Sequence, residues 1–290
     1  MFLCPKALLS MAVIANFAGL QIVSAAPVSI ASPDGRIEVT ITDEKGQPKY
    51  NVTRDGEIIV EPSELGIRFA DGLHLDEGFE ITDTFHSASN QKWELPWGES
   101  RYIRDEHKEL LVKFSHMDDD RKFDVRFRLF NEGVGFRYEM PGNGERTIID
   151  ELTRFRVDQD ATTWWTPAGE FNRYEYIYKT TPLRDVYRAH TPLTMRLEGG
   201  THLVLHEAAL LNYGGAWIDQ RRGGELEIDI APRFDGSKVI VNGDFVTPWR
   251  TLQIADDAAG LINGATMTLN LNEPNKLGDV SYVEPQKYVG

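Results

Sequence analysis

Apolar and polar residues alternate with a period of two along most of the chain, which is typical of strands that bury one face. Alternating runs occupy residues 36–43, 109–114, 122–130, 134–140, 225–232, 250–255 and 267–272. The sequence Asn131-Glu132-Gly133 separates two of these runs and is a good signal for a hairpin turn. Sheets with one buried and one solvated face are typical of antiparallel strands packed as a sandwich. We therefore predict an all-β fold, a large antiparallel β-sandwich.

Helical periodicity is weak in the same chain. After the N-terminal segment, no stretch of a dozen residues carries a helical stripe, and only residues 182–193 could hold one short turn of helix. Strands at this spacing over about 250 residues favour one oversized sandwich rather than two domains, and we place it at residues 27–277. Residues 278–290 begin a new pattern after a stretch rich in Pro, Asn and Gly, so we interpret them as the truncated start of a following domain.

The net charge and the N-terminus narrow the class of protein. With 31 basic and 45 acidic residues the formal charge is −14, which argues against nucleic acid and anionic membranes as partners. Residues 1–26 combine Lys6, a long apolar run and a small-residue end, and predict a secretory signal peptide, with a membrane anchor as the alternative. The only cysteine, Cys4, leaves with that peptide. A cysteine-free secreted chain suits a bacterial periplasm, and we expect no membrane contact after cleavage.

One acidic residue stands where a predicted strand ends. In HLVLHEAALLNYGG, residues 202–215, the alternation stops at Glu207. A zinc-protease motif is excluded because Leu210 stands where the second histidine should be. A calcium ion takes six to eight oxygen ligands, of which Glu207 and Asn212 could supply only a few. From the residues alone, a solvated loop glutamate is the simpler interpretation.

Aromatic residues gather in two segments that Pro and Gly interrupt. The first, residues 162–178, contains Trp164, Trp165 and Glu175, and the second, residues 93–106, contains Trp97. Tryptophan has a flat apolar face that suits the C–H-rich face of a sugar, and a nearby carboxylate can bind hydroxyl groups. Because binding groups tend to lie on loops, these four residues are our candidates for sugar binding. Packing in the core of the sandwich is the alternative.

Motifs for other chemistries are absent from the sequence. It contains no nucleophile elbow, phosphate-binding loop or dinucleotide fingerprint. Glycoside hydrolysis needs two carboxylates at a defined separation, and spacing along the chain singles out no such pair. We therefore assign no catalytic residue.

Several separated segments together resemble the N-terminal domain of glycoside hydrolase family 97. They are SPDGRIEVTI, WELPWGESRYIRDEHKEL, FDVRFRLFNEGVGFRYEMP, TTWWTPAG followed by YEYIY, HTPLTMRLEGGTHLVLHEAALLNYGG, and TPWRTLQIAD followed by LNLNEP. The resemblance extends from about Ser29 to the C-terminal end, and the order and number of the segments make it specific. It implies a β-super-sandwich of the galactose-mutarotase type, followed by a (β/α)₈ catalytic barrel whose entry resembles EPQKYVG.

The resemblance also implies a function. Family members are bacterial periplasmic α-glucosidases and α-galactosidases, inverting or retaining, that need Ca²⁺, and their N-terminal domain lends that ion one glutamate. The matching position here is Glu207. Since the catalytic acids belong to the barrel, we expect this chain to be inactive alone, to brace the barrel and to wall part of the pocket for an oligosaccharide or other α-glycoside. We expect Arg250 and residues 97–102 to lie at the domain interface.

Two other functions stay open at this stage. Aldose mutarotases on the same fold use histidine and glutamate as acid and base. Adjacent His206 and Glu207 point to opposite faces of a strand and cannot form that pair, which leaves His190 with Glu175. A free-standing carbohydrate-binding protein is the second alternative, with the aromatic residues as its binding surface.

Overall fold

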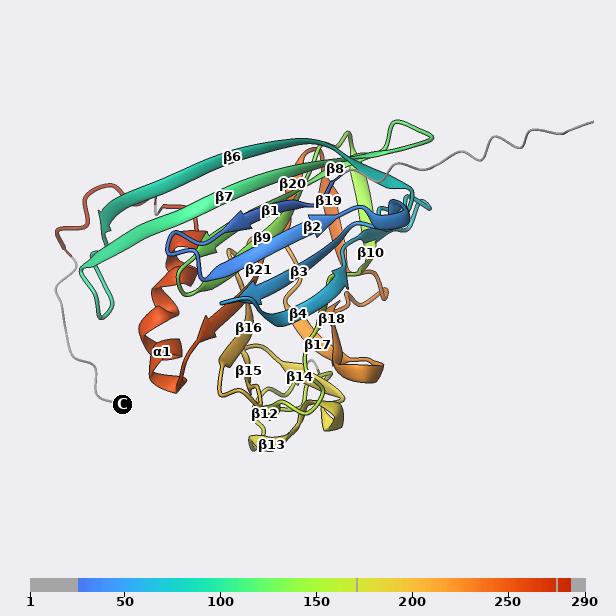
Figure 1. The fold of residues 1–290 in the computed structure, drawn as a ribbon. Helices are drawn as coiled ribbons and strands as arrows, with labels where there is room; N and C mark the ends of the chain where they lie inside the picture. Colours follow the sequence, from blue (N-terminus) through green and yellow to red (C-terminus); the bar gives the residue numbers. More distant parts are fainter. Residues whose placement is uncertain (1–25, 171, 275, 283–290) are drawn as a thin grey trace, which may run out of the picture.

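The computed structural model describes residues 26–170, 172–274 and 276–282, and strands dominate it (Figure 1). All strand pairs in this described part are antiparallel. No helix within it has both the length and the apolar character to cross a membrane. The predicted signal peptide lies outside the described residues except for Ala26, and the predicted following domain is described only at residues 278–282.

Two large sheets form the sandwich, which confirms the predicted all-β fold. The eight-stranded sheet has the order β1 (Val28–Ala31), β2 (Ile37–Thr42), β3 (Lys49–Arg54), β4 (Glu57–Glu64), β11 (Arg154–Arg156), β18 (Glu225–Ile230), β17 (Ala216–Gln220) and β14 (Arg188–His190). The ten-stranded sheet has the order β13 (Lys179–Pro182), β12 (Thr162–Trp165), β15 (Leu193–Arg196), β16 (His202–Ala208), β21 (Trp249–Ala255), β9 (Gly133–Met140), β8 (Lys122–Phe130), β7 (Tyr102–His116) and β6 (Phe79–Glu94), with β20 (Phe245–Val246) paired to β9. A small third sheet has the order β19 (Val239–Asn242), β10 (Glu145–Glu151) and β5 (Ile67–Phe69).

The core fills the space between the inner faces of the two large sheets. Phe127 on β8 and Phe136 on β9 face each other in register, and their ring centroids are 5.3 Å apart. Tyr50 enters from β3 of the opposite sheet, 4.9 Å from the ring of Phe136, and its hydroxyl donates to the carbonyl of Arg154. Each fully buried large apolar side chain contributes about 1.5–3 kcal/mol to the free energy of folding. Burial of the apolar residues of the alternating runs is therefore the main source of stability.

The short helices lie at turns and near the C-terminus. The 3₁₀ turns are η1 (Glu44–Gly46), η2 (Leu183–Asp185), which lies inside the region predicted for a short helical turn, and η3 (Arg222–Gly224). α1 (Ala258–Asn263) packs against β21 and β16 and continues into the 3₁₀ helix η4 (Gly264–Leu271) (Figure 1).

The strand predicted at residues 267–272 is therefore wrong. The Asp257 side chain caps the start of α1 by accepting from the Gly260 amide at 2.7 Å, which begins a helical path. Met267 and Leu271 are four residues apart and both pack on Phe130 and Trp249 at the outer face of the ten-stranded sheet. Residues four apart lie on one side of a helix and also on one face of a strand. A short apolar run therefore does not distinguish a helix from a strand.

Candidate functional site

Glu207 lies at the end of β16, where the strand prediction placed it. Ala208 is the last residue of the strand, and Ala209 and Asn212 then adopt positive φ angles of 52°. Left-handed residues bend the chain sharply, so residues 209–215 leave the sheet at once. This local geometry places Glu207 at the rim of the sandwich.

Arg250 joins Glu207 to a second carboxylate. Glu207 and Arg250 face each other across β16 and β21, and Arg250 Nη1 donates to Glu207 Oε2 at 2.7 Å. The remaining guanidinium edge grips Glu151, with Nε 2.8 Å from Oε1 and Nη2 2.7 Å from Oε2. Two parallel hydrogen bonds of this kind fix the orientation of both groups. We call Glu151, Glu207 and Arg250 the buried triad.

The buried triad has more negative than positive formal charges. Arg250 and Glu151 are fully buried and the Glu207 side chain is 8% exposed. Burial alone would lower the pKa of Arg250, but the charge and hydrogen bonds of Glu151 together with the charge of Glu207 raise it above its ordinary value. Two carboxylates then share one guanidinium. A cation that approached Glu207 from solvent would be attracted by this excess of negative charge.

Glu207 is held rather than free. Its Oε1 accepts from the Ala216 amide at 3.1 Å while Oε2 accepts from Arg250, so the side chain is neither solvated nor projecting into space. Each carboxylate oxygen has a second lone pair, and Glu207 can therefore still offer an oxygen to a cation at the rim. Within the described residues, no group of three or more His, Cys, Asp or Glu could hold a metal. A calcium ion bound to Glu207 would therefore need oxygen ligands other than such a cluster.

Arg250 was expected at the interface with a following domain, but it lies inside the sandwich. It is fully buried because it occupies an inner-face position of β21, in phase with Leu252 and Ile254. The partnership with Glu151 was missed at the sequence level because 99 residues separate the two. The sequence did contain one indication that Arg250 has a buried partner. Arg250 is a charged residue at a position where the alternation of the strand predicts an apolar one.

The predicted sugar-binding residues of the first aromatic segment are in different environments. Trp165 is 1% exposed, and its indole donates to Thr181 Oγ1, so the ring fills the core and has no free face for a sugar. Trp164 lies on the outer face of the sheet and stacks parallel to His202 at 6.5 Å. Glu175 lies on the exposed segment after β12. The segment does not bring these three side chains into one cluster.

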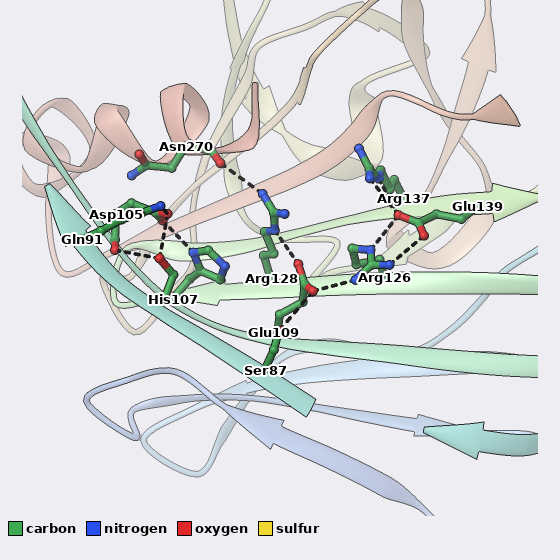
Figure 2. A network of polar contacts seen from close by, with 11 residues as sticks. Ser87, Gln91, Asp105, His107, Glu109, Arg126, Arg128, Arg137, Glu139 and Asn270 are labelled. Carbon is green, nitrogen blue, oxygen red and sulfur yellow. Dashed lines mark hydrogen bonds and ion pairs between the residues drawn. The ribbon is translucent and has the colours of Figure 1, made fainter. Parts of the chain in front are cut away.

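Trp97 lines a groove of about 770 Å³ between β6, β7 and the C-terminal segment. Trp97 is 43% exposed. The floor holds Asp105 and His107, whose Oδ1 and Nδ1 atoms are 2.6 Å apart (Figure 2). Asp105 also accepts from Ser89 and Gln91. Sequence reasoning did not select Asp105 or His107, although both are polar positions on the outer phase of β7.

The arrangement expected of a mutarotase is not formed. His190 is buried, and neither of its ring nitrogens has a hydrogen-bond partner in the described residues. The Tyr174 ring covers it with a centroid separation of 3.9 Å, and burial lowers the pKa of His190. A histidine that bonds to no carboxylate, Glu175 included, lacks the acid–base partner this chemistry needs.

Comparison with known proteins assigns the chain to a family. The glycosyl-hydrolase 97 N-terminal family matches residues 30–274. The chain belongs to glycosyl-hydrolase family 97. A family 97 enzyme from Pseudoalteromonas sp. strain K8 superposes with a TM-score of 0.86 at 42% identity over 89% of this chain and 40% of that one. A β-arabinopyranosidase with a TM-score of 0.71 and 20% identity shares the fold.

Curated relatives of this family 97 domain are much longer proteins. A probable retaining α-galactosidase of Streptomyces bingchenggensis is 26% identical over 266 residues, which is 89% of this chain and 39% of that protein. A retaining α-galactosidase of Bacteroides thetaiotaomicron is 22% identical over 293 residues, with 43% of its length covered. The chain thus spans about two fifths of the relatives it matches, at their N-terminal part.

Proposed function

We propose that this family 97 domain is the non-catalytic N-terminal part of a periplasmic α-glycosidase and that Glu207 supplies one ligand to a calcium ion shared with a catalytic barrel. The carrying observation is the buried triad, in which Arg250 holds Glu207 at the sandwich rim while two carboxylates share one positive charge. Hard cations such as Ca²⁺ bind carboxylate oxygens. A bound calcium ion would add positive charge at the rim, and the barrel would supply its remaining ligands.

The substrate we propose is an α-glycoside, with the domain forming only part of the pocket wall. The curated relatives are named α-galactosidases, whereas the Pseudoalteromonas enzyme was solved with panose and with acarbose. The 42% identity to the latter favours its type of substrate for this chain. Trp164, Glu175 and Trp97 remain candidates for sugar contact, since each has surface that a ligand could reach.

A free-standing carbohydrate-binding function has less support. The groove beside Trp97 has suitable aromatic walls, but its charged groups already bind one another. Asp105 accepts from His107, Ser89 and Gln91, and both oxygens of Glu109 accept from arginines. Groups satisfied in this way gain little by exchanging their partners for sugar hydroxyls.

The test compares the chain alone with a chimera. The chimera replaces the matching N-terminal portion of the Pseudoalteromonas enzyme with residues 30–274 of this chain. The chain alone should not hydrolyse p-nitrophenyl α-glucoside or α-galactoside, whereas the chimera should. In the chimera Glu207→Gln should raise the calcium concentration needed for half-maximal activity, and it should reduce the rise in Tm that calcium produces, because one anionic ligand is lost.

The matched control is Glu64→Gln. Glu64 is also ion-paired to an arginine, Arg154, at 2.7 Å, but it lies on β4 of the eight-stranded sheet, whereas Glu207 lies on β16 of the ten-stranded sheet. It should leave the calcium dependence of the chimera unchanged. Hydrolysis by the chain alone would contradict the non-catalytic role, and an equal calcium response in Glu207→Gln and Glu64→Gln would remove the assignment of Glu207.

A further inference from the structure

Glu151, the inner carboxylate of the buried triad, is surrounded by hydrogen-bond donors. Its Oε1 accepts from Arg250 Nε at 2.8 Å and from Thr153 Oγ1 at 3.0 Å. Its Oε2 accepts from Arg250 Nη2 at 2.7 Å and from the Tyr213 hydroxyl at 3.2 Å. A carboxylate has about four lone-pair sites, so the four donors occupy all the sites of Glu151. This carboxylate has no oxygen left to offer to a further ligand.

A chain of hydrogen bonds leads through the core to Glu151. The Gly66 amide donates to the Tyr138 hydroxyl at 2.9 Å, and the hydroxyl oxygens of Tyr138 and Thr153 are 2.9 Å apart. Because Thr153 donates its hydrogen to Glu151, Tyr138 is the donor in its contact with Thr153. Tyr138 and Thr153 are both fully buried. Hydrogen bonds that run in one direction polarise one another, so this chain stabilises negative charge on Glu151.

Glu207, the outer carboxylate of the buried triad, is bound less completely. Among the described residues it accepts one hydrogen bond on each oxygen, from Arg250 and from the Ala216 amide. About half of its lone-pair sites therefore stay open. The Glu207 side chain also keeps 8% of its surface exposed, whereas that of Glu151 has none. The two carboxylates thus differ in role: Glu207 can bind a cation, and Glu151 can act only through Arg250.

The charge of Arg250 affects how strongly Glu207 can bind a cation. A guanidinium paired with Glu207 alone would cancel its negative charge and repel a second cation. Glu151 holds two of the guanidinium nitrogens and Glu207 holds the third, so two carboxylates and one guanidinium carry a formal charge of −1. Charges interact strongly where water is excluded. Arg250 can therefore orient Glu207 without neutralising it.

We propose that Glu151 is a positioning residue for calcium binding: it balances the charge of Arg250, so that the guanidinium orients Glu207 and leaves it the negative charge that attracts the cation. This inference rests on the proposed function, in which Glu207 is a calcium ligand. Residues that hold a metal ligand in place, without touching the metal, commonly change the affinity for it about 10–100-fold. Glu151 should therefore set the calcium affinity from a position inside the sandwich.

Two substitutions of Glu151 separate its charge from its shape. Calcium affinity is measured by isothermal titration calorimetry on the chimera after treatment with a chelator, so that the readout does not depend on hydrolysis. Glu151→Gln keeps the shape and removes the charge, and it should bind calcium at least tenfold more weakly than the parent. Glu151→Asp keeps the charge on a side chain one methylene shorter, and it should stay within threefold of the parent. A purely structural role would favour the opposite order, because glutamine fits the space better than aspartate.

A double variant tests whether Glu151 acts through Arg250. Glu151→Gln/Arg250→Met removes one charge of each sign and restores the formal charge of the site, but it loses the group that orients Glu207. It should bind calcium less tightly than the parent and at least threefold more tightly than Glu151→Gln. Glu227→Gln is the matched control, because Glu227 is buried and paired with Arg154 at 2.9 Å on the eight-stranded sheet. It should leave the calcium affinity unchanged.

The outcomes separate this inference from the proposed function. An unchanged calcium affinity in Glu207→Gln overturns the proposed function and this inference with it. If Glu207→Gln weakens binding, the inference alone is overturned by parental affinity in Glu151→Gln, by weaker binding in Glu151→Asp than in Glu151→Gln, or by a double variant no tighter than Glu151→Gln. Should Glu151→Gln fail to fold, as judged by near-UV circular dichroism, the double variant is compared with Glu207→Gln. The double variant should bind calcium more tightly, and equal affinities overturn the inference.

Discussion

Arg250 and Glu151 form a bidentate ion pair from which solvent is excluded on both sides. The two residues come from β21 of the ten-stranded sheet and β10 of the small sheet, so the pair joins two sheets that share no strand ladder. Glu207 binds the third edge of the same guanidinium. The position of Glu207 at the rim is therefore set by the buried Arg250 guanidinium. This group cannot move without leaving two buried carboxylates unpaired.

Arg250→Met tests the importance of this pair for stability. The change keeps much of the side-chain volume but leaves Glu151 and Glu207 buried without their cation. Breaking a buried pair by removing one partner costs about 3–5 kcal/mol, and we expect a loss of this size in the free energy of unfolding, measured by urea denaturation. Arg36→Met is the control, because Arg36 pairs with Asp55 on the surface and such pairs contribute about 0–1 kcal/mol. Equal losses in the two variants would mean that the triad is not a buried network.

The sequence predicts the strands well because alternation reports directly on which face is buried. Phe123, Val125 and Phe127 appear as expected on the inner face of β8, and Glu207 lies one residue before the end of β16, close to where the sequence predicts the strand to end. The pairing of Arg250 with Glu151 could not be predicted, because contacts between residues far apart depend on the topology. Residues 267–272 were misassigned because a short apolar run fits two periodicities.

Two neighbouring glycines provide a test of the backbone. Gly223 and Gly224 both adopt positive φ, 72° and 78°, but a Cβ at Gly223 would meet open space while one at Gly224 would lie 2.2 Å from the Val157 carbonyl oxygen. Gly223→Ala should therefore cost only the left-handed strain, about 1–2 kcal/mol. Gly224→Ala should cost about 1–3 kcal/mol more, because β11 and its neighbours must move. Thermal unfolding of the two variants measures the difference, and a Gly223→Ala variant no more stable than Gly224→Ala would contradict this close approach.

Because His190 is buried, we expect the protein to lose stability on mild acidification. Burial lowers the pKa of His190 in the folded state, whereas in the unfolded chain a histidine titrates near about 6.5. As the pH falls through the unfolded-state pKa, the unfolded state binds more protons than the folded state. The contribution of His190 to stability is therefore complete above the unfolded-state pKa and decreases as the pH falls below it. The decrease ends once the pH is below the folded-state pKa. His190→Phe should make the change in Tm between pH 7.5 and 5.5 smaller than in the parent. His86→Gln, at an exposed position on β6, should keep the parent's pH dependence, and a parental pH dependence in His190→Phe would contradict the neutral buried state.

Asn270 should control how firmly the C-terminal segment is held on the sheet. Its side chain satisfies the Trp93 indole and the Arg104 carbonyl, so Asn270→Ala leaves two polar groups unpaired, at a cost of about 1–3 kcal/mol each where water cannot replace the lost partner. We expect a lower free energy of unfolding and faster amide hydrogen exchange within residues 264–271. Asn263→Ala, at an exposed helix end, should change stability by less than about 0.5 kcal/mol. If the two variants exchange at the same rate, the apolar contacts of Met267 and Leu271 hold η4 without Asn270, and the two hydrogen bonds are incidental to its position on the outer face of the ten-stranded sheet.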